Sequence, residues 1–203
     1  MADDIGGVWR TVGGRRIFIK DGQSLSVAMK ESGKFLAKLG NKKNINSIEL
    51  EGILVEKIPP EQIEEKIKDY EKEICGLEVE YSYVIEPDGS VYKFTGNDTN
   101  VAIITTKDSI ITHNHPIDED IYRSFGEDDY CFMRDYEFKE LRLSNPDYNY
   151  SAKKLKQFTG ISYNELWREA IENATFSEDF EFQHEIMLLL AKKGYIEYER
   201  RNN

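Results

Sequence analysis

Two histidines separated by one residue follow a short apolar run in the segment SIITHNHP. Residues two apart on a strand project from the same face, with backbones about 6.5 to 7 Å apart, so His113 and His115 can grip one metal ion. Catalytic zinc typically takes three protein ligands at about 2.0 to 2.3 Å and keeps a fourth position for water. A third ligand is therefore expected elsewhere in the chain.

The third ligand is predicted in the segment GEDDYCFMRDYEF, whose apolar residues recur at helical spacing. Asp129 shares a helix face with the apolar residues three, four and seven positions after it, and that face should pack on a sheet. A buried carboxylate needs a partner, which a metal ion would supply. Glu127 and Asp128 are the alternative ligands if the preceding loop has a different register.

A general base is predicted on an earlier strand. The segment EVEYSYVIEPDGSVYKFTG alternates around Asp88-Gly89 as two antiparallel strands would, and Glu80 lies in the row opposite to that of Tyr81. Zinc lowers the pKa of a bound water towards about 7, where a nearby carboxylate can take the proton and deliver it to a leaving amine. Glu80 is the candidate for this acid/base role, and Glu78 is the second choice.

These pieces together resemble the JAB/MPN (JAMM) metalloproteases, which cleave peptide or isopeptide bonds. The likeness is greatest to a bacterial and phage branch in which a glutamate-bearing strand leads into a DG turn, then THNHP, then a serine-containing loop and an aspartate, and it covers about residues 60 to 150. The resemblance implies a zinc-dependent hydrolase that acts on a protein or peptide. It also implies an α/β (α+β) fold, a mixed sheet flanked by helices.

One position departs from the family pattern. The family has a serine three residues before the aspartate, where it helps to stabilise the oxyanion, and this chain has Gly126 there. Ser124, two residues earlier, is the candidate to replace it. The departure leaves open a non-catalytic MPN-like module that binds a phage or host protein, in phage assembly or in host interference. An intracellular effector of a mobile element is a third interpretation.

A small appendage is predicted over residues 1–45, before a JAB/MPN-like metal-binding domain with C-terminal helices over 46–203. A hairpin is expected over residues 8–19 around Gly13-Gly14, and a short helix that ends at Gly40 should follow Asp21-Gly22. This segment is also similar to one in phage head-morphogenesis proteins of Gram-positive hosts, which implies a phage or prophage origin.

The remaining elements follow from periodicity. A loop is expected at NPDYNYS, residues 145–151. Strands are predicted around 79–86, 90–95, 109–114 and 138–143, and helices over about 60–75, 126–138, 162–173 and 178–193.

Composition excludes several classes of function. With 38 acidic and 27 basic residues the net charge is −11, which disfavours nucleic acid as a partner. No run of about 18 apolar residues and no signal-peptide core occur, so a cytoplasmic protein without a membrane partner is expected in the host cell, with the virion as the alternative. The two cysteines, Cys75 and Cys131, fit free thiols in a reducing compartment.

The sequence disfavours two other roles for its histidines. A zinc deaminase would need a glutamate two residues after a ligand histidine and a PCxxC motif, and the chain has neither. His184 falls at helical spacing with apolar residues, which predicts a place in the core or an internal hydrogen bond rather than a metal ligand.

Overall fold

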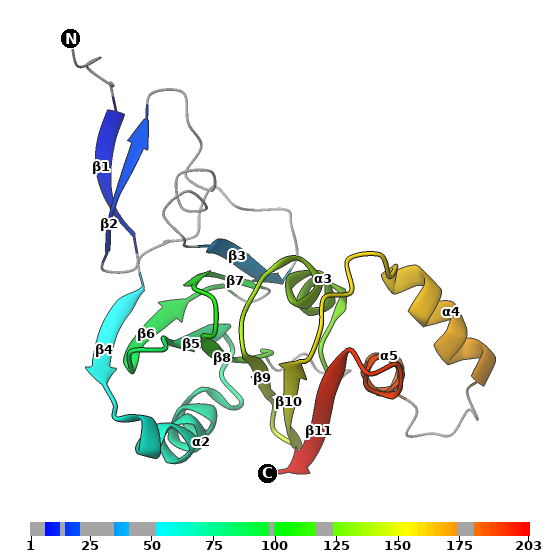
Figure 1. Cartoon of the computed structure of the whole chain (residues 1–203). Coiled ribbons are helices and arrows are strands. Elements are labelled where there is room, and N and C mark those ends of the chain that lie inside the picture. Colours follow the sequence, from blue (N-terminus) through cyan, green and yellow to red (C-terminus); the bar gives the residue numbers. More distant parts are fainter. Residues whose placement is uncertain are drawn as a thin grey trace.

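The computed structural model describes residues 7–12, 15–20, 35–40, 52–97, 100–116, 124–173 and 181–203. Its centre is a mixed sheet of seven strands in the order β11-β10-β9-β8-β5-β6-β4, with helices on both faces (Figure 1). Only β8 and β9 run parallel; the other neighbours are antiparallel. This architecture confirms the predicted fold class.

The sheet strands are β4 (Ile53–Lys57), β5 (Tyr81–Ile85), β6 (Ser90–Thr95), β8 (Ile110–Asn114), β9 (Glu140–Ser144), β10 (Tyr148–Lys154) and β11 (Ile196–Asn202). Two further pairs are β1 (Gly7–Val12) with β2 (Arg15–Lys20), and β3 (Phe35–Gly40) with β7 (Asn100–Thr105). The helices are the 3-10 turn η2 (Pro60–Gln62) and the α-helices α2 (Ile63–Ile74), α3 (Glu127–Asp135), α4 (Tyr163–Asn173) and α5 (Phe182–Lys192).

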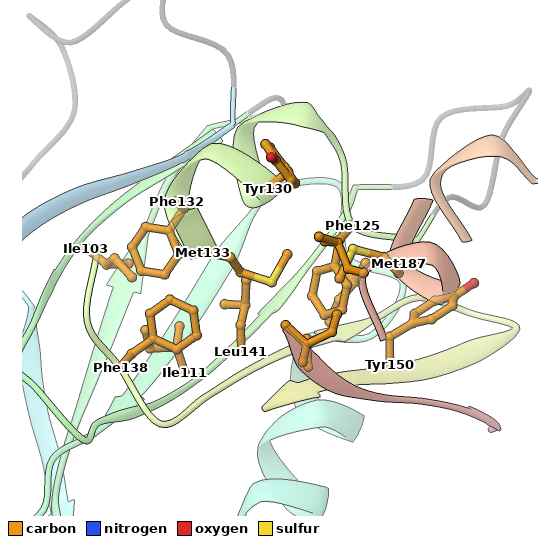
Figure 2. Packing of buried hydrophobic residues seen from close by; sticks show 14 of the residues in the cluster. Ile103, Ile111, Phe125, Tyr130, Phe132, Met133, Phe138, Leu141, Tyr150 and Met187 are labelled. Atoms are coloured by element: carbon orange, nitrogen blue, oxygen red, sulfur yellow. The ribbon is translucent and has the colours of Figure 1, made fainter. Parts of the chain in front are cut away.

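The two faces of the sheet have separate hydrophobic cores. Alternation along β5 sends Tyr83 and Ile85 towards α2, and Val84 towards the opposite face. The larger core lies on that opposite face, where residues of α3, α4, α5 and β7 pack on the sheet, and Figure 2 shows its labelled members. Among the described α-helices, α2 alone covers the face of the sheet that bears Tyr83 and Ile85. The helical segment begins at Pro60 and ends shortly before Gly76, whose φ is 74°, as the proline and the glycine in the sequence predict.

Most predicted elements are confirmed. The hairpin over residues 8–19 is the β1–β2 pair, the four predicted strands are β5, β6, β8 and β9, and the four later helices are η2–α2, α3, α4 and α5. The turn between β5 and β6 contains Gly89 at φ 84°, and a Cβ there would lie 2.1 Å from the carbonyl oxygen of Ile58. The DG turn therefore requires glycine.

Two local predictions were wrong. Residues 35–40, expected to end a helix, form β3, because their backbone pairs with β7 from Phe35↔Thr105 to Gly40↔Asn100. The apolar residues of this run fit the period of a helix as well as that of a strand, so the pairing with β7 decides its structure. The start of that predicted helix lies outside the described residues, and the domain boundary at residue 45 stays a prediction. The expected loop over 145–151 gives way at Tyr148 to β10, which pairs on both sides with β9 and β11.

Helix α2 is joined to the sheet by a buried guanidinium. Arg142 of β9 donates from Nε to Glu140 at 2.6 Å and from Nη2 to Glu64 at 2.8 Å, and its Nη1 lies 3.6 Å from Glu71. Glu64 and Glu71 belong to α2, and Glu71 and Glu140 are almost fully buried. Arg142 therefore contributes to the charge compensation of two buried carboxylates.

Substitution of Arg142 by Met should destabilise the protein strongly. Removing one partner of a buried ion cluster typically costs about 3 to 5 kcal/mol, because the remaining charges stay buried without compensation. The matched control is Arg134→Met, whose partner Asp135 is exposed, and which should cost about 1 kcal/mol or less. Urea unfolding of both variants measures the difference, and equal small losses would contradict this role for Arg142.

Candidate metal centre

Strand β8 delivers the two histidines to the face of the sheet that α3 covers. It lies between β5 and β9, and His113, next to last in the strand, is fully buried. His115 follows the strand end with 29% of its side chain exposed. The two rings meet edge to face with centroids 5.2 Å apart. One ligand is therefore held in the core and the other faces the solvent side of the site.

Asp129 reaches both histidines from the first turn of α3. Its Oδ1 lies 3.1 Å from His113 Nε2, and its Oδ2 lies 3.2 Å from His115 Nε2. The backbone N–H of Gly126 donates to Oδ2 at 2.8 Å, which orients the carboxylate by a helix-capping bond. The position at a helix N-terminus also favours a negative charge.

The arrangement satisfies the requirements of a metal site. Ligand atoms of His113, His115 and Asp129 all lie within 4.8 Å of one another, and this is the group that could hold an ion among the described residues. Two ligands of a tetrahedral zinc ion are separated by about 3.3 Å, close to the two separations between nitrogen and oxygen above. Glu127 is exposed, and Asp128 is not part of this group.

Unsatisfied polar atoms point to the same conclusion. His113 Nε2 and Asp129 Oδ1 are buried, and neither forms a hydrogen bond of good geometry, although they are close to each other. Burial raises the pKa of Asp129, but the imidazoles of His113 and His115 lower it by more, so the carboxyl remains ionised. A buried carboxylate oxygen and a buried imidazole nitrogen, both without a hydrogen bond, suit the coordination of a divalent cation.

Glu80 belongs to the same face of the sheet. Ser82 of β5 pairs with His113 of β8, and Glu80 lies two residues before Ser82, so strand alternation places both on the histidine face. If the pairing of β5 with β8 is continued by two residues, Glu80 lies opposite His115. Its backbone is held by bonds to the segment after β6, and the residue is only 2% exposed, whereas Glu78 is exposed.

Asn114, between the two histidines, is a positioning residue that sequence reasoning missed. Its side chain points to the other face, where Oδ1 accepts from the N–H of Tyr81 at 2.7 Å and Nδ2 donates to the carbonyl of Val79 at 3.1 Å. These bonds hold the residues on either side of Glu80. The only signal in the sequence was its place between two ligands.

Ser124 takes part in a buried chain of polar groups. Its hydroxyl shares a hydrogen bond of 2.9 Å with the hydroxyl of Tyr198 on β11, which lies 2.8 Å from Nδ1 of His184 on α5. Ser124 is fully buried. The internal hydrogen bond predicted for His184 is confirmed, and burial lowers the pKa of His184 to about 4. The oxyanion role of Ser124 stays a prediction.

Comparisons of the chain with protein-family models, with curated proteins and with solved structures found no match. Among the described residues, no helix has the length and apolar character to cross a membrane. Cys75 and Cys131 are free thiols.

The metal content of the purified protein tests the centre. We expect about one zinc ion per chain in the wild type after dialysis and almost none in His113→Ala, because the loss of one of three protein ligands leaves too few donors. Elemental mass spectrometry provides the measurement.

His184→Ala is the matched control, since this histidine bonds Tyr198 and should leave the zinc content unchanged. A wild type that stays free of metal after reconstitution with zinc would refute the site.

Proposed function

We propose that this protein is a zinc-dependent hydrolase that cleaves a peptide or isopeptide bond. The observation that carries the proposal is the placement of a buried carboxylate, Glu80, on the sheet face that presents His113 and His115 and that Asp129 of α3 approaches. Two histidines and an aspartate with a neighbouring glutamate are the donor set and the acid/base of the JAB/MPN metalloproteases that the sequence resembles.

Each residue has a separate role in the proposal. His113, His115 and Asp129 would hold the metal, and Gly126 N–H fixes the orientation of the Asp129 carboxylate. A zinc ion bound there would act as a Lewis acid and lower the pKa of water at the site. Glu80 would take the proton from the attacking water and return it to the leaving nitrogen. Asn114 holds Glu80 in place through the backbone on either side.

The site is built for a substrate that arrives from the His115 side. His113 and Asp129 are buried, whereas His115 is partly exposed, so the reacting carbonyl would reach the site from the side of His115.

The resemblance of the N-terminal segment to phage head-morphogenesis proteins supports a phage or prophage origin. We therefore expect the substrate to be a phage or host protein in the cytoplasm of a bacterial host.

A non-catalytic MPN-like binding module is the second candidate. It is favoured by one specific observation, that Gly126 supplies no hydroxyl to the site while the hydroxyl of Ser124 is bonded to Tyr198. In this case the metal would be structural and the protein would bind a phage or host partner without cleaving it.

Glu80→Gln should separate these two functions. The amide keeps the shape of the side chain but accepts no proton, so zinc content should stay at about one per chain while cleavage falls by about 10² to 10⁴-fold. Zinc-loaded protein is incubated with a proteome-derived peptide library, and new N-termini are identified by mass spectrometry. Wild type that cleaves no peptide, or a variant as active as wild type, would contradict the enzyme mechanism.

Gly126→Ser should raise the activity. A Cβ at this position meets nothing closer than Asp129 Oδ2 at 3.8 Å, and φ of −77° suits any residue, so a serine fits without repacking. Because one oxyanion donor is typically worth about 10² to 10³-fold in rate, we expect an increase of about tenfold or more. The control Gly126→Ala adds the Cβ without the hydroxyl and should not increase the rate. Equal rates for both variants would exclude an oxyanion role at residue 126.

A further inference from the structure

A cavity of about 510 Å³ lies on the face of the sheet opposite to the metal centre. Helix α2, which contacts β5, β8 and β9 (Figure 1), forms one wall of the cavity, and residues of β10 and β11 form another. Asn149 of β10 and Arg201 of β11 are cross-strand partners, so their side chains share this face. Lys68 and Lys72 line the cavity from α2.

The charge of this cavity is opposite to that of the whole chain. Three cationic side chains, those of Lys68, Lys72 and Arg201, line it together with one acidic side chain, that of Glu71, although the net charge of the protein is −11. Glu71 is already directed at Arg142, whose Nη1 lies 3.6 Å from its Oε1. The cationic side chains that line the cavity therefore outnumber the acidic one.

The two lysines have no ion-pair partner among the described residues. In the part of the chain that the structure describes, neither Lys68 nor Lys72 forms an ion pair or hydrogen bond through its side chain. They are four residues apart on α2, a spacing at which like charges repel each other on a helix surface. An anion between them would remove this repulsion.

Two buried atoms at the cavity are also unsatisfied. Nε of Arg201 and Oδ1 of Asn149 are inaccessible to solvent and have no hydrogen-bond partner, and the carboxylate nearest to Arg201 Nε, that of Glu199, is 3.8 Å away. Arg201 Nε is a donor and Asn149 Oδ1 is an acceptor. Because solvent does not reach either atom, an anion in the cavity would bind through the outer guanidinium nitrogens of Arg201, whose side chain is 32% exposed.

We propose that this cavity is a binding site for a small organic anion, a phosphate monoester or a carboxylate. Lys68, Lys72 and Arg201 would neutralise its anionic oxygens. The volume suits a molecule the size of a metabolite rather than a polymer. The site is separate from the metal centre and does not depend on the proposed hydrolase function.

Isothermal titration of the full chain with glycerol 3-phosphate and with citrate tests the proposal. We expect at least one of them to bind, and the one that binds identifies the headgroup as phosphate or carboxylate. The double variant Lys68→Ser/Lys72→Ser should weaken this binding by about tenfold or more, because two of the three cations are lost. Both lysines are exposed on a helix, so the variant should fold as the wild type does.

The matched control is Lys107→Ser/Lys192→Ser, which removes two exposed lysines away from the cavity and should bind within about twofold of the wild type. In an amide NMR spectrum the added anion should shift the side-chain signals of Asn149 and Asn202, which line the cavity. No binding of either anion at about 10 mM, or equal weakening in both double variants, would overturn the proposal.

Discussion

Side chains alternate between the two faces of β8, and this strand has a neighbour on each side, so each of its residues is committed to one buried face. His113 therefore lies on the α3 side, where Asp129 meets it, and Asn114 lies on the α2 side, where it holds the backbone around Glu80. A shift of one residue in the pairing with β5 would exchange these roles. The pairing of Ser82 with His113 thus determines on which face of the sheet His113 and Asn114 lie.

Both faces of the sheet bury charges, but they compensate them differently. On the α2 face, Arg142 supplies the cation for Glu140 and Glu71 from within the chain. On the α3 face, no lysine or arginine approaches Asp129 among the described residues, and only His113 and His115 surround it. Because a buried carboxylate needs compensation, this face is the one suited to an external cation.

The C-terminal elements support the site from behind. Tyr198 of β11 connects Ser124, in the segment that leads to α3, with His184 of α5, and Phe125 packs between the His113 ring and the rings of the larger core. The segment before α3 is thus held by side chains more than fifty residues away in the chain. This arrangement gives Ser124 a structural partner and leaves space beside Gly126 at the site itself.

The sequence by itself determined the candidate metal ligands, the DG hairpin and the four helical segments η2–α2, α3, α4 and α5, because each depends on spacing within one short segment: two residues for His113 and His115, and three to seven for the face of Asp129. Only the tertiary structure decided that residues 35–40 form a strand, that Asn114 holds Glu80, and that Lys68, Lys72 and Arg201 border one cavity. These features depend on backbone pairing and on contacts between distant segments. Local periodicity carries no information about which strands become neighbours, since the pairing free energy depends on residues far apart in the chain.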